Sequence, residues 1–126
     1  MKNLEQIRAA AALPVAERTT KADVNKLPAL IIANGLLAAT AFANEKKDNG
    51  RGAKRPAMQA VLNGVAKHLA SLTIVPGATD ADSLVEKLTK DPQANSTKLQ
   101  RATAETLAFI AYVKRFTTKE KSESED

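Results

Sequence analysis

Apolar residues recur three or four positions apart along most of this 126-residue chain, which places them on one face of a helix. Only the short segment 72–75 suggests a strand. The pattern predicts helices over about 3–18, 28–46, 56–72, 80–90 and 97–118, with a short helical turn before the second of them. The chain is therefore expected to be all-α, a compact bundle of about five to six helices.

Polar residues and prolines mark where these helices are expected to begin. Four residues are expected to be N-terminal caps, each with a suitable polar partner three positions later: Asn3, Thr20, Thr79 and Thr97. Pro28 and Pro56 fit the first turn of a helix, where the missing N–H of proline is not needed. Pro14 is expected to kink or split the first helix, and Asp91-Pro92 to stop the fourth.

The segment from Leu27 to Asn44 carries no charge over 18 residues, the short edge of a transmembrane length. Proline, glycine and many alanines dilute its hydrophobicity, so a helix buried all round by protein explains it better. Gly35 in its centre predicts a close helix approach with no room for a Cβ atom. Asn34 is expected to be a hydrogen-bonded core residue, with a contact across an interface as the alternative.

The last predicted helix carries two different faces. Its apolar face is expected to belong to the core: Leu99, Ala102, Phe109, Val113 and Phe116. A second, mostly basic stripe is expected to be a surface: Lys98, Arg101, Glu105, Tyr112, Arg115 and Lys119. One helix thus combines a core anchor with a candidate binding surface.

The charge of the chain is concentrated in its body. The net charge is +5, but residues 119–126 hold two cations and four acids, which leaves 17 cations against 10 acids in residues 1–118. We expect a single helical domain over 1–118 with a basic surface, and a flexible, disordered charged tail over 119–126. Such a body suits an anionic partner, nucleic acid first, although ordinary solubility charge is the alternative. The loop 46–55, with five cations and one acid, either clamps phosphates or is a solvated connector.

Little in the chain suggests catalysis. It has no cysteine and one histidine, His68, which is expected to be structural or solvent-facing. The acids near the fourth helix suit capping and solvation rather than a metal site, and the common phosphate-binding and nucleophile motifs do not occur. We therefore expect no enzyme activity, no metal and no cofactor. The first residues do not form a signal peptide, so the chain is expected to be cytoplasmic, without a membrane segment.

Three ordered blocks resemble the small helical subunit of the type III-B CRISPR effector, the fifth protein of the Cmr (RAMP module) complex. They are residues 4–12, then 26–42 with its Leu-Pro and Asn-Gly-Leu motifs, then 103–116 ending in Lys-Arg-Phe. Each block alone is a weak helical signature, whereas the ordered set spans nearly the whole chain. The chain departs from the family in having Tyr112 where a tryptophan is expected, and in the strongly basic loop 46–55.

The resemblance implies a non-catalytic structural subunit of an antiviral ribonucleoprotein. Copies of such a subunit stack beside the backbone subunits that hold the crRNA and help form the groove for target RNA. Cleavage and signalling belong to other subunits, including a large polymerase-like one. Charge and loop position, rather than a family motif, give the candidate RNA contacts: Arg8, Lys46, Lys47, Arg51, Lys54, Arg55, Lys114 and Arg115.

Two alternatives stay open at this point. The chain could be a free-standing basic helical protein that binds nucleic acid by itself, with strongly salt-dependent affinity. It could also be the small subunit of a type III-A effector, which shares the helical, basic character but lacks the Leu-Pro and Asn-Gly-Leu arrangement.

Overall fold

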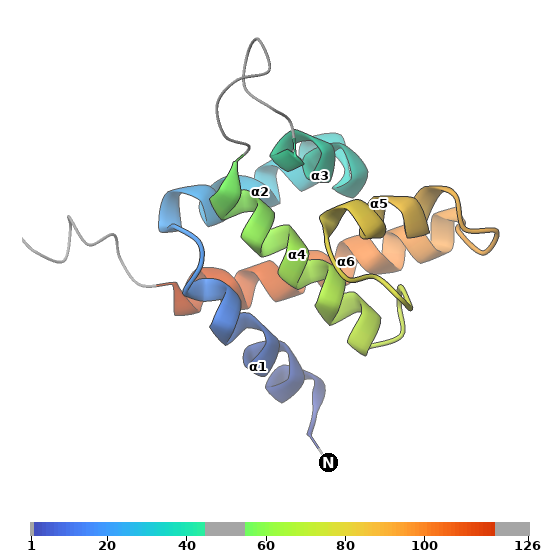
Figure 1. Cartoon of the computed structure of the whole chain (residues 1–126). Helices are drawn as coiled ribbons and strands as arrows, with labels where there is room; N and C mark the ends of the chain where they lie inside the picture. The colour runs from blue at the N-terminus through green and yellow to red at the C-terminus, as the bar shows by residue number, and fades with distance from the viewer. Residues whose placement is uncertain (1, 45–54, 118–126) are drawn as a thin grey trace, which may run out of the picture.

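The computed structural model describes residues 2–44 and 55–117, which form six helices and no strand (Figure 1). The helices are α1 (Leu4–Ala16), α2 (Lys21–Asn34), α3 (Leu36–Asn44), α4 (Pro56–Ser71), α5 (Ala81–Thr89) and α6 (Ser96–Phe116). The predicted all-α bundle is confirmed. The tail 119–126 and all of the basic loop except Arg55 lie outside the described residues.

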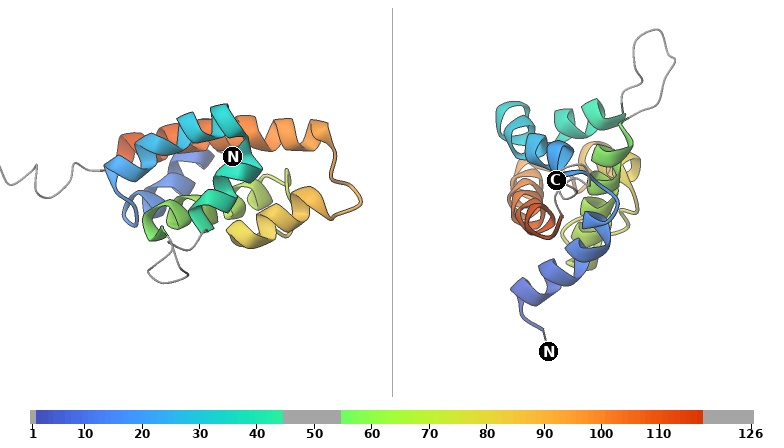
Figure 2. Two further views of the ribbon diagram at one scale, coloured as in Figure 1. Left: turned by 90° about the horizontal axis from the view of Figure 1, so that it is seen from above. Right: turned by 90° about the vertical axis from the view of Figure 1, so that its left-hand side faces the viewer.

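Helices α4 and α6 organise the bundle. The central helix α4 contacts each of the other five helices, and α1 packs more extensively against α6 than any other pair packs. Helix α6 also runs beside α2, as Figure 2 shows. Because α1 contacts both α4 and α6, side chains from three helices can meet at one buried point between them.

The core lies between these helices, and its largest fully buried side chain is Phe109 of α6. The predicted core face of α6 is confirmed at Ala102, Phe109 and Val113, and Leu99 is half-buried against the core. The prediction is wrong for Phe116, which is 37% exposed. Phe116 is the last helical residue, and it is the next residue, Thr117, that is buried there.

Two predicted helix caps are confirmed. The Asn3 side chain accepts a hydrogen bond from the backbone N–H of Gln6, and the Gln6 side chain accepts one from the N–H of Asn3, each at 2.9 Å. The hydroxyl of Thr20 accepts from the N–H of Asp23 at 3.1 Å, so α2 begins directly after it. Pro14 lies within α1, which continues past it for two residues without splitting.

Two other caps are displaced from the predicted residues. Asp80, not Thr79, caps α5 by accepting from the N–H of Ser83, and Asn95, not Thr97, caps α6 by accepting from the N–H of Lys98. Carboxylate and amide oxygens cap at least as well as a threonine hydroxyl, so these neighbours compete successfully for the position.

The predicted single helix over 28–46 is wrong. Since Thr20 caps α2, the helix starts at Lys21 and passes through Pro28 to Asn34, so Pro28 lies in the helix interior rather than in its first turn. The break falls at Gly35, which has φ +94° and ψ 160°. Residues with a side chain rarely adopt this backbone conformation. The glycine therefore allows the chain to leave α2 and start α3 one residue later.

The expected core position of Asn34 and the expected close helix approach at Gly35 are also wrong. A Cβ atom at Gly35 would meet nothing within 4 Å, so its backbone conformation, not a close helix approach, requires glycine. Asn34 is exposed beside the turn instead of buried in the core. The close approach occurs at Gly64 of α4, where a Cβ atom would overlap Cγ2 of Val15 in α1.

The uncharged segment 27–44 is not buried all round, because its α2 part presents Ile32 at 74% exposure. Within the described part of the chain, no helix is long and apolar enough to cross a membrane.

Substitution of Gly35 by alanine tests the assigned break. We expect it to lower the free energy of unfolding by about 2 kcal/mol, because alanine is strained at this positive φ. Urea denaturation measures the change, and Asn34→Ala, at the preceding residue, is the control. The control is expected to stay within about 0.5 kcal/mol of the parent, since Asn34 is exposed. A larger loss for the control than for Gly35→Ala would contradict both assignments.

Candidate functional site

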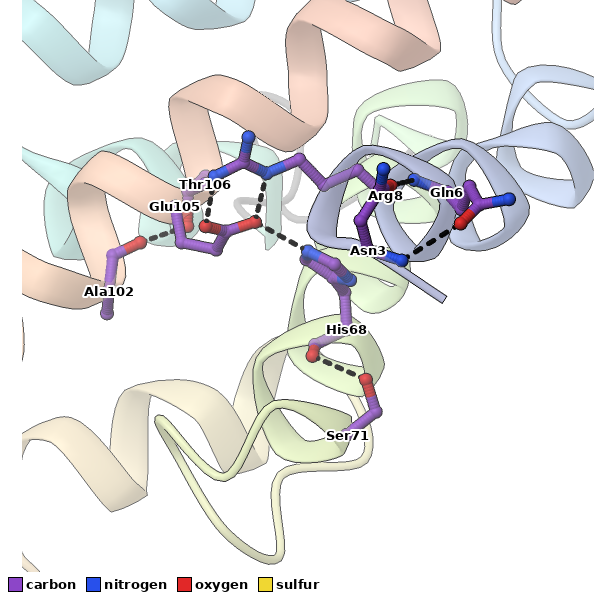
Figure 3. Close-up of polar contacts among 8 residues, drawn as sticks. All are labelled: Asn3, Gln6, Arg8, His68, Ser71, Ala102, Glu105 and Thr106. Atoms are coloured by element: carbon purple, nitrogen blue, oxygen red, sulfur yellow. Dashed lines mark hydrogen bonds and ion pairs between the residues drawn. The ribbon is translucent and has the colours of Figure 1, made fainter. Parts of the chain in front are cut away.

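A buried ionic cluster joins α1, α4 and α6 (Figure 3). Glu105 of α6 receives both arms of the Arg8 guanidinium: Nε lies 2.7 Å from Oε2, and Nη2 lies 2.7 Å from Oε1. The Nε2 atom of His68, in α4, lies 2.8 Å from the same Oε2. One carboxylate therefore binds two partners that lie 97 and 37 residues away in the sequence.

The cluster is largely buried, and its hydrogen bonds outweigh the cost of removing its charges from water. The side chain of Glu105 is 9% exposed, that of His68 is fully buried, and that of Arg8 is 24% exposed. The hydrogen bonds from Arg8 hold the pKa of the Glu105 carboxyl below its usual range, with a further contribution from His68. The same bonds raise the pKa of Arg8. The carboxylate is therefore ionised at neutral pH and accepts from both partners.

The carboxylate of Glu105 determines which ring nitrogen of His68 carries a proton. An ionised carboxylate only accepts, so the proton between the two side chains lies on His68 Nε2. The other ring nitrogen, Nδ1, is buried and has no hydrogen-bond partner among residues 2–44 and 55–117. The imidazole stacks on the ring of Phe109, with centroids 4.7 Å apart and planes at 22°. His68 is thus structural, one of the two roles that the sequence suggested.

The position of Glu105 corrects the predicted basic stripe of α6. Helical spacing places this residue on the surface stripe, but it is buried beneath Arg8. The sequence held one signal for this, since Glu105 is the only charged residue between Arg101 and Lys114. A lone acid in an otherwise uncharged run suggests burial, but the identity of its partners depends on helix packing.

The cluster links α1, α4 and α6 through side-chain hydrogen bonds. Oε2 of Glu105 accepts from Nε2 of His68 and from Nε of Arg8, and Oε1 of Glu105 accepts from Nη2 of Arg8. No group of three potential metal-ligating side chains occurs in residues 2–44 and 55–117.

The predicted RNA contacts come from separate elements of the structure. Lys114 and Arg115 lie exposed in the last turn of α6, as the basic stripe predicted for Arg115. Arg8 lies in the buried cluster. Lys46, Lys47, Arg51 and Lys54 lie outside the described residues.

Arg55 links α3 to the start of α4. Its Nη1 atom donates to the backbone oxygen of Phe42 at 2.8 Å, and its guanidinium lies 3.7 Å from the centre of the Phe42 ring. Such a stacked cation stabilises the end of the adjacent helix. Arg55 therefore has a structural role in addition to any contact with a ligand.

The C-terminal end of α6 gathers cations. Nζ of Lys21 donates to the backbone oxygens of Lys114 at 2.9 Å and Thr117 at 3.4 Å. These bonds satisfy carbonyl groups that the helix leaves open, and positive charge is favourable at this end of a helix dipole. Lys114 and Arg115 thus sit where charge also stabilises the helix.

Comparison with known families matches most of the chain to a CRISPR-associated family. The family model described as CRISPR-associated protein (Cas_Cmr5) matches residues 3–120, a range that contains all six helices. Searches of curated proteins and of solved structures give no match.

Proposed function

The chain belongs to the Cas_Cmr5 family of CRISPR-associated proteins, and on that premise we propose that it is a non-catalytic structural subunit of a type III-B Cmr effector. Family membership indicates a Cmr-associated subunit that assembles with other Cmr subunits. In our proposal, copies of the chain stack in the cytoplasm beside the backbone that holds the crRNA. The stack then helps to form the groove that accommodates target RNA.

The observation that carries this proposal is the family match over residues 3–120, from the cap of α1 past the end of α6. Because the match spans every helix, the whole bundle, rather than one motif, belongs to the family. The ionic cluster supports a structural role, since Glu105 is bonded to both His68 and Arg8.

An RNA-facing role is supported by the exposed pair Lys114 and Arg115. Contacts from such side chains to phosphates carry no sequence information by themselves. They suit an effector in which pairing with a guide RNA supplies the specificity.

Charge reversal at the end of α6 tests the RNA-facing role. We expect Lys114→Glu together with Arg115→Glu to weaken target-RNA binding by the assembled effector about tenfold, because two phosphate-attracting charges become repulsive. Filter binding of the reconstituted complex measures this. The control is Lys67→Glu together with Lys90→Glu, which makes the same change of charge at exposed residues of α4 and the end of α5.

Unchanged RNA binding by the Lys114–Arg115 variant would remove this pair from the proposal. A salt titration of the isolated protein separates the free-standing alternative. A subunit is expected to bind RNA weakly when alone, whereas a free-standing binder would bind tightly with a steep dependence on salt.

A further inference from the structure

Three shallow depressions run in series along the N-terminal half of α6, and together we call them the α6 groove. The first, of about 340 Å³, includes Arg8, Glu105 and Arg101 in its wall. The second, of about 380 Å³, continues from Arg101 to Lys98. The third, of about 200 Å³, continues from Lys98 to Lys87. Arg101 and Lys98 therefore stand on the two walls that neighbouring depressions share.

The lining of the groove combines cations with uncharged polar and apolar side chains, the apolar ones mostly in the first depression. Its four cations, Arg8, Lys87, Lys98 and Arg101, face two acids. Both acids already accept bonds from within the protein: Glu105 from Arg8 and His68, and Asp91 from the backbone N–H of Gln93 at 2.9 Å. Arg8 and Glu105 neutralise each other, so Lys87, Lys98 and Arg101 against Asp91 leave the groove with a net positive charge.

Uncharged polar side chains complete the middle depression. They are Thr73, Gln93, Asn95 and Thr97. Hydroxyl and amide groups of this kind bond to phosphate and sugar oxygens in nucleic-acid complexes. The exposed ring of Pro76 lies beside them and offers apolar contact to sugars or bases. The mixture suits a nucleic-acid strand better than an acidic protein segment.

The cations are arranged in a line. Lys98 and Arg101 are three residues apart on α6, about 4.5 Å along the helix axis. Glu105 comes four residues later, about 6 Å further on, and there the Arg8 guanidinium covers the carboxylate. These intervals are of the same order as the axial spacing of phosphates along one strand, about 3.4 Å in a duplex and longer in an extended strand.

We propose that the α6 groove binds the sugar–phosphate backbone of an RNA strand without reading its sequence. The inference rests on the proposed function for the source of that strand, the target RNA of the effector. It adds Lys98 and Arg101, in the N-terminal half of α6, to the pair Lys114 and Arg115 at the end of the same helix. Neither residue stood among the contacts expected from the sequence.

The test uses the full-length protein and a 12-nucleotide single-stranded RNA at low salt. In amide NMR spectra, we expect RNA to shift signals in 73–76 and 93–101. Lys98→Glu together with Arg101→Glu is expected to raise the dissociation constant at least tenfold. Losing two phosphate contacts is also expected to lower the slope of log affinity against log salt by about 1.4.

A matched control keeps the comparison specific. Arg18→Glu together with Lys67→Glu makes the same change of charge in a separate depression between α1 and α4. Its RNA affinity is expected to change less than threefold. Thermal unfolding of both variants shows whether each is folded.

Three results would overturn the proposal that the α6 groove binds RNA. The shifts could be confined to the last turn of α6, no shift could appear, or both double variants could weaken binding equally. If the groove variant bound RNA normally but no longer joined the effector, the groove would be a protein contact instead. In that case, the proposed function would stand and only this assignment would fail.

Discussion

Replacing Phe109 with alanine is expected to lower the free energy of unfolding by about 4 kcal/mol. Phe109 is the largest of the fully buried side chains, and its ring stacks on His68. The substitution removes a large apolar surface and leaves a cavity between α4 and α6 that the neighbouring side chains fill only in part. Since domains of this size have total stabilities of about 5–15 kcal/mol, such a variant is expected to be marginally folded.

Phe116→Ala is the matched control for this experiment. It makes the same chemical change seven residues along the same helix, but at a side chain that is 37% exposed. We expect it to cost less than about 1 kcal/mol in urea denaturation. A loss at Phe116 as large as that at Phe109 would contradict the assignment of the core face.

Replacing Glu105 with alanine is expected to lower the free energy of unfolding by about 3 kcal/mol. Removing one partner of a buried pair leaves the others without compensation, which typically costs about 3–5 kcal/mol. The lower end applies because Arg8 is 24% exposed and can still reach water. The control is Glu86→Ala: this exposed acid lies 4.0 Å from Lys90, and its loss is expected to cost about 0.5 kcal/mol at most.

Acidification gives the same cluster a second signature. Arg8 lowers the pKa of Glu105 in the folded protein, so the unfolded chain takes up a proton at this group first as the pH falls. The stabilisation is therefore complete above the unfolded pKa of about 4.3, and it is lost as the pH falls through the lower folded pKa. Urea denaturation of the parent and of Glu105→Gln should give stabilities that converge on acidification. A difference that stays constant with pH would show that the charge of Glu105 does not matter.

Local signals predicted much of the fold. The cap of Asn3 with Gln6 and the proline start at Pro56 gave the beginnings of α1 and α4 correctly, because both depend on neighbours in sequence. The predicted helix start at Pro28 was wrong because a local signal can fit more than one arrangement. Proline there is compatible with a first turn, but the cap at Thr20 starts the helix earlier, and only the backbone conformation of Gly35 shows where it ends.

The candidate site was only partly predictable. Exposure of Arg115 followed from helical spacing, which is a local property. The bond between Arg8 and Glu105 joins residues 97 positions apart and depends on the packing of α1 against α6. The α6 groove has the same origin, since the loop after α4 supplies one of its walls. Lys98 and Arg101 were visible on a basic stripe, but the depressions that they separate were not.

The most direct test of the central claim, that this chain is a structural subunit of a Cmr effector, is native mass spectrometry of that effector. The chain would be co-expressed with the other Cmr subunits and a crRNA, and the intact assembly would be weighed with and without it. We predict an assembly that contains the crRNA, the backbone and large subunits, and more than one copy of the chain. A complete assembly that never incorporates the chain, while the chain alone binds RNA tightly, would contradict the claim.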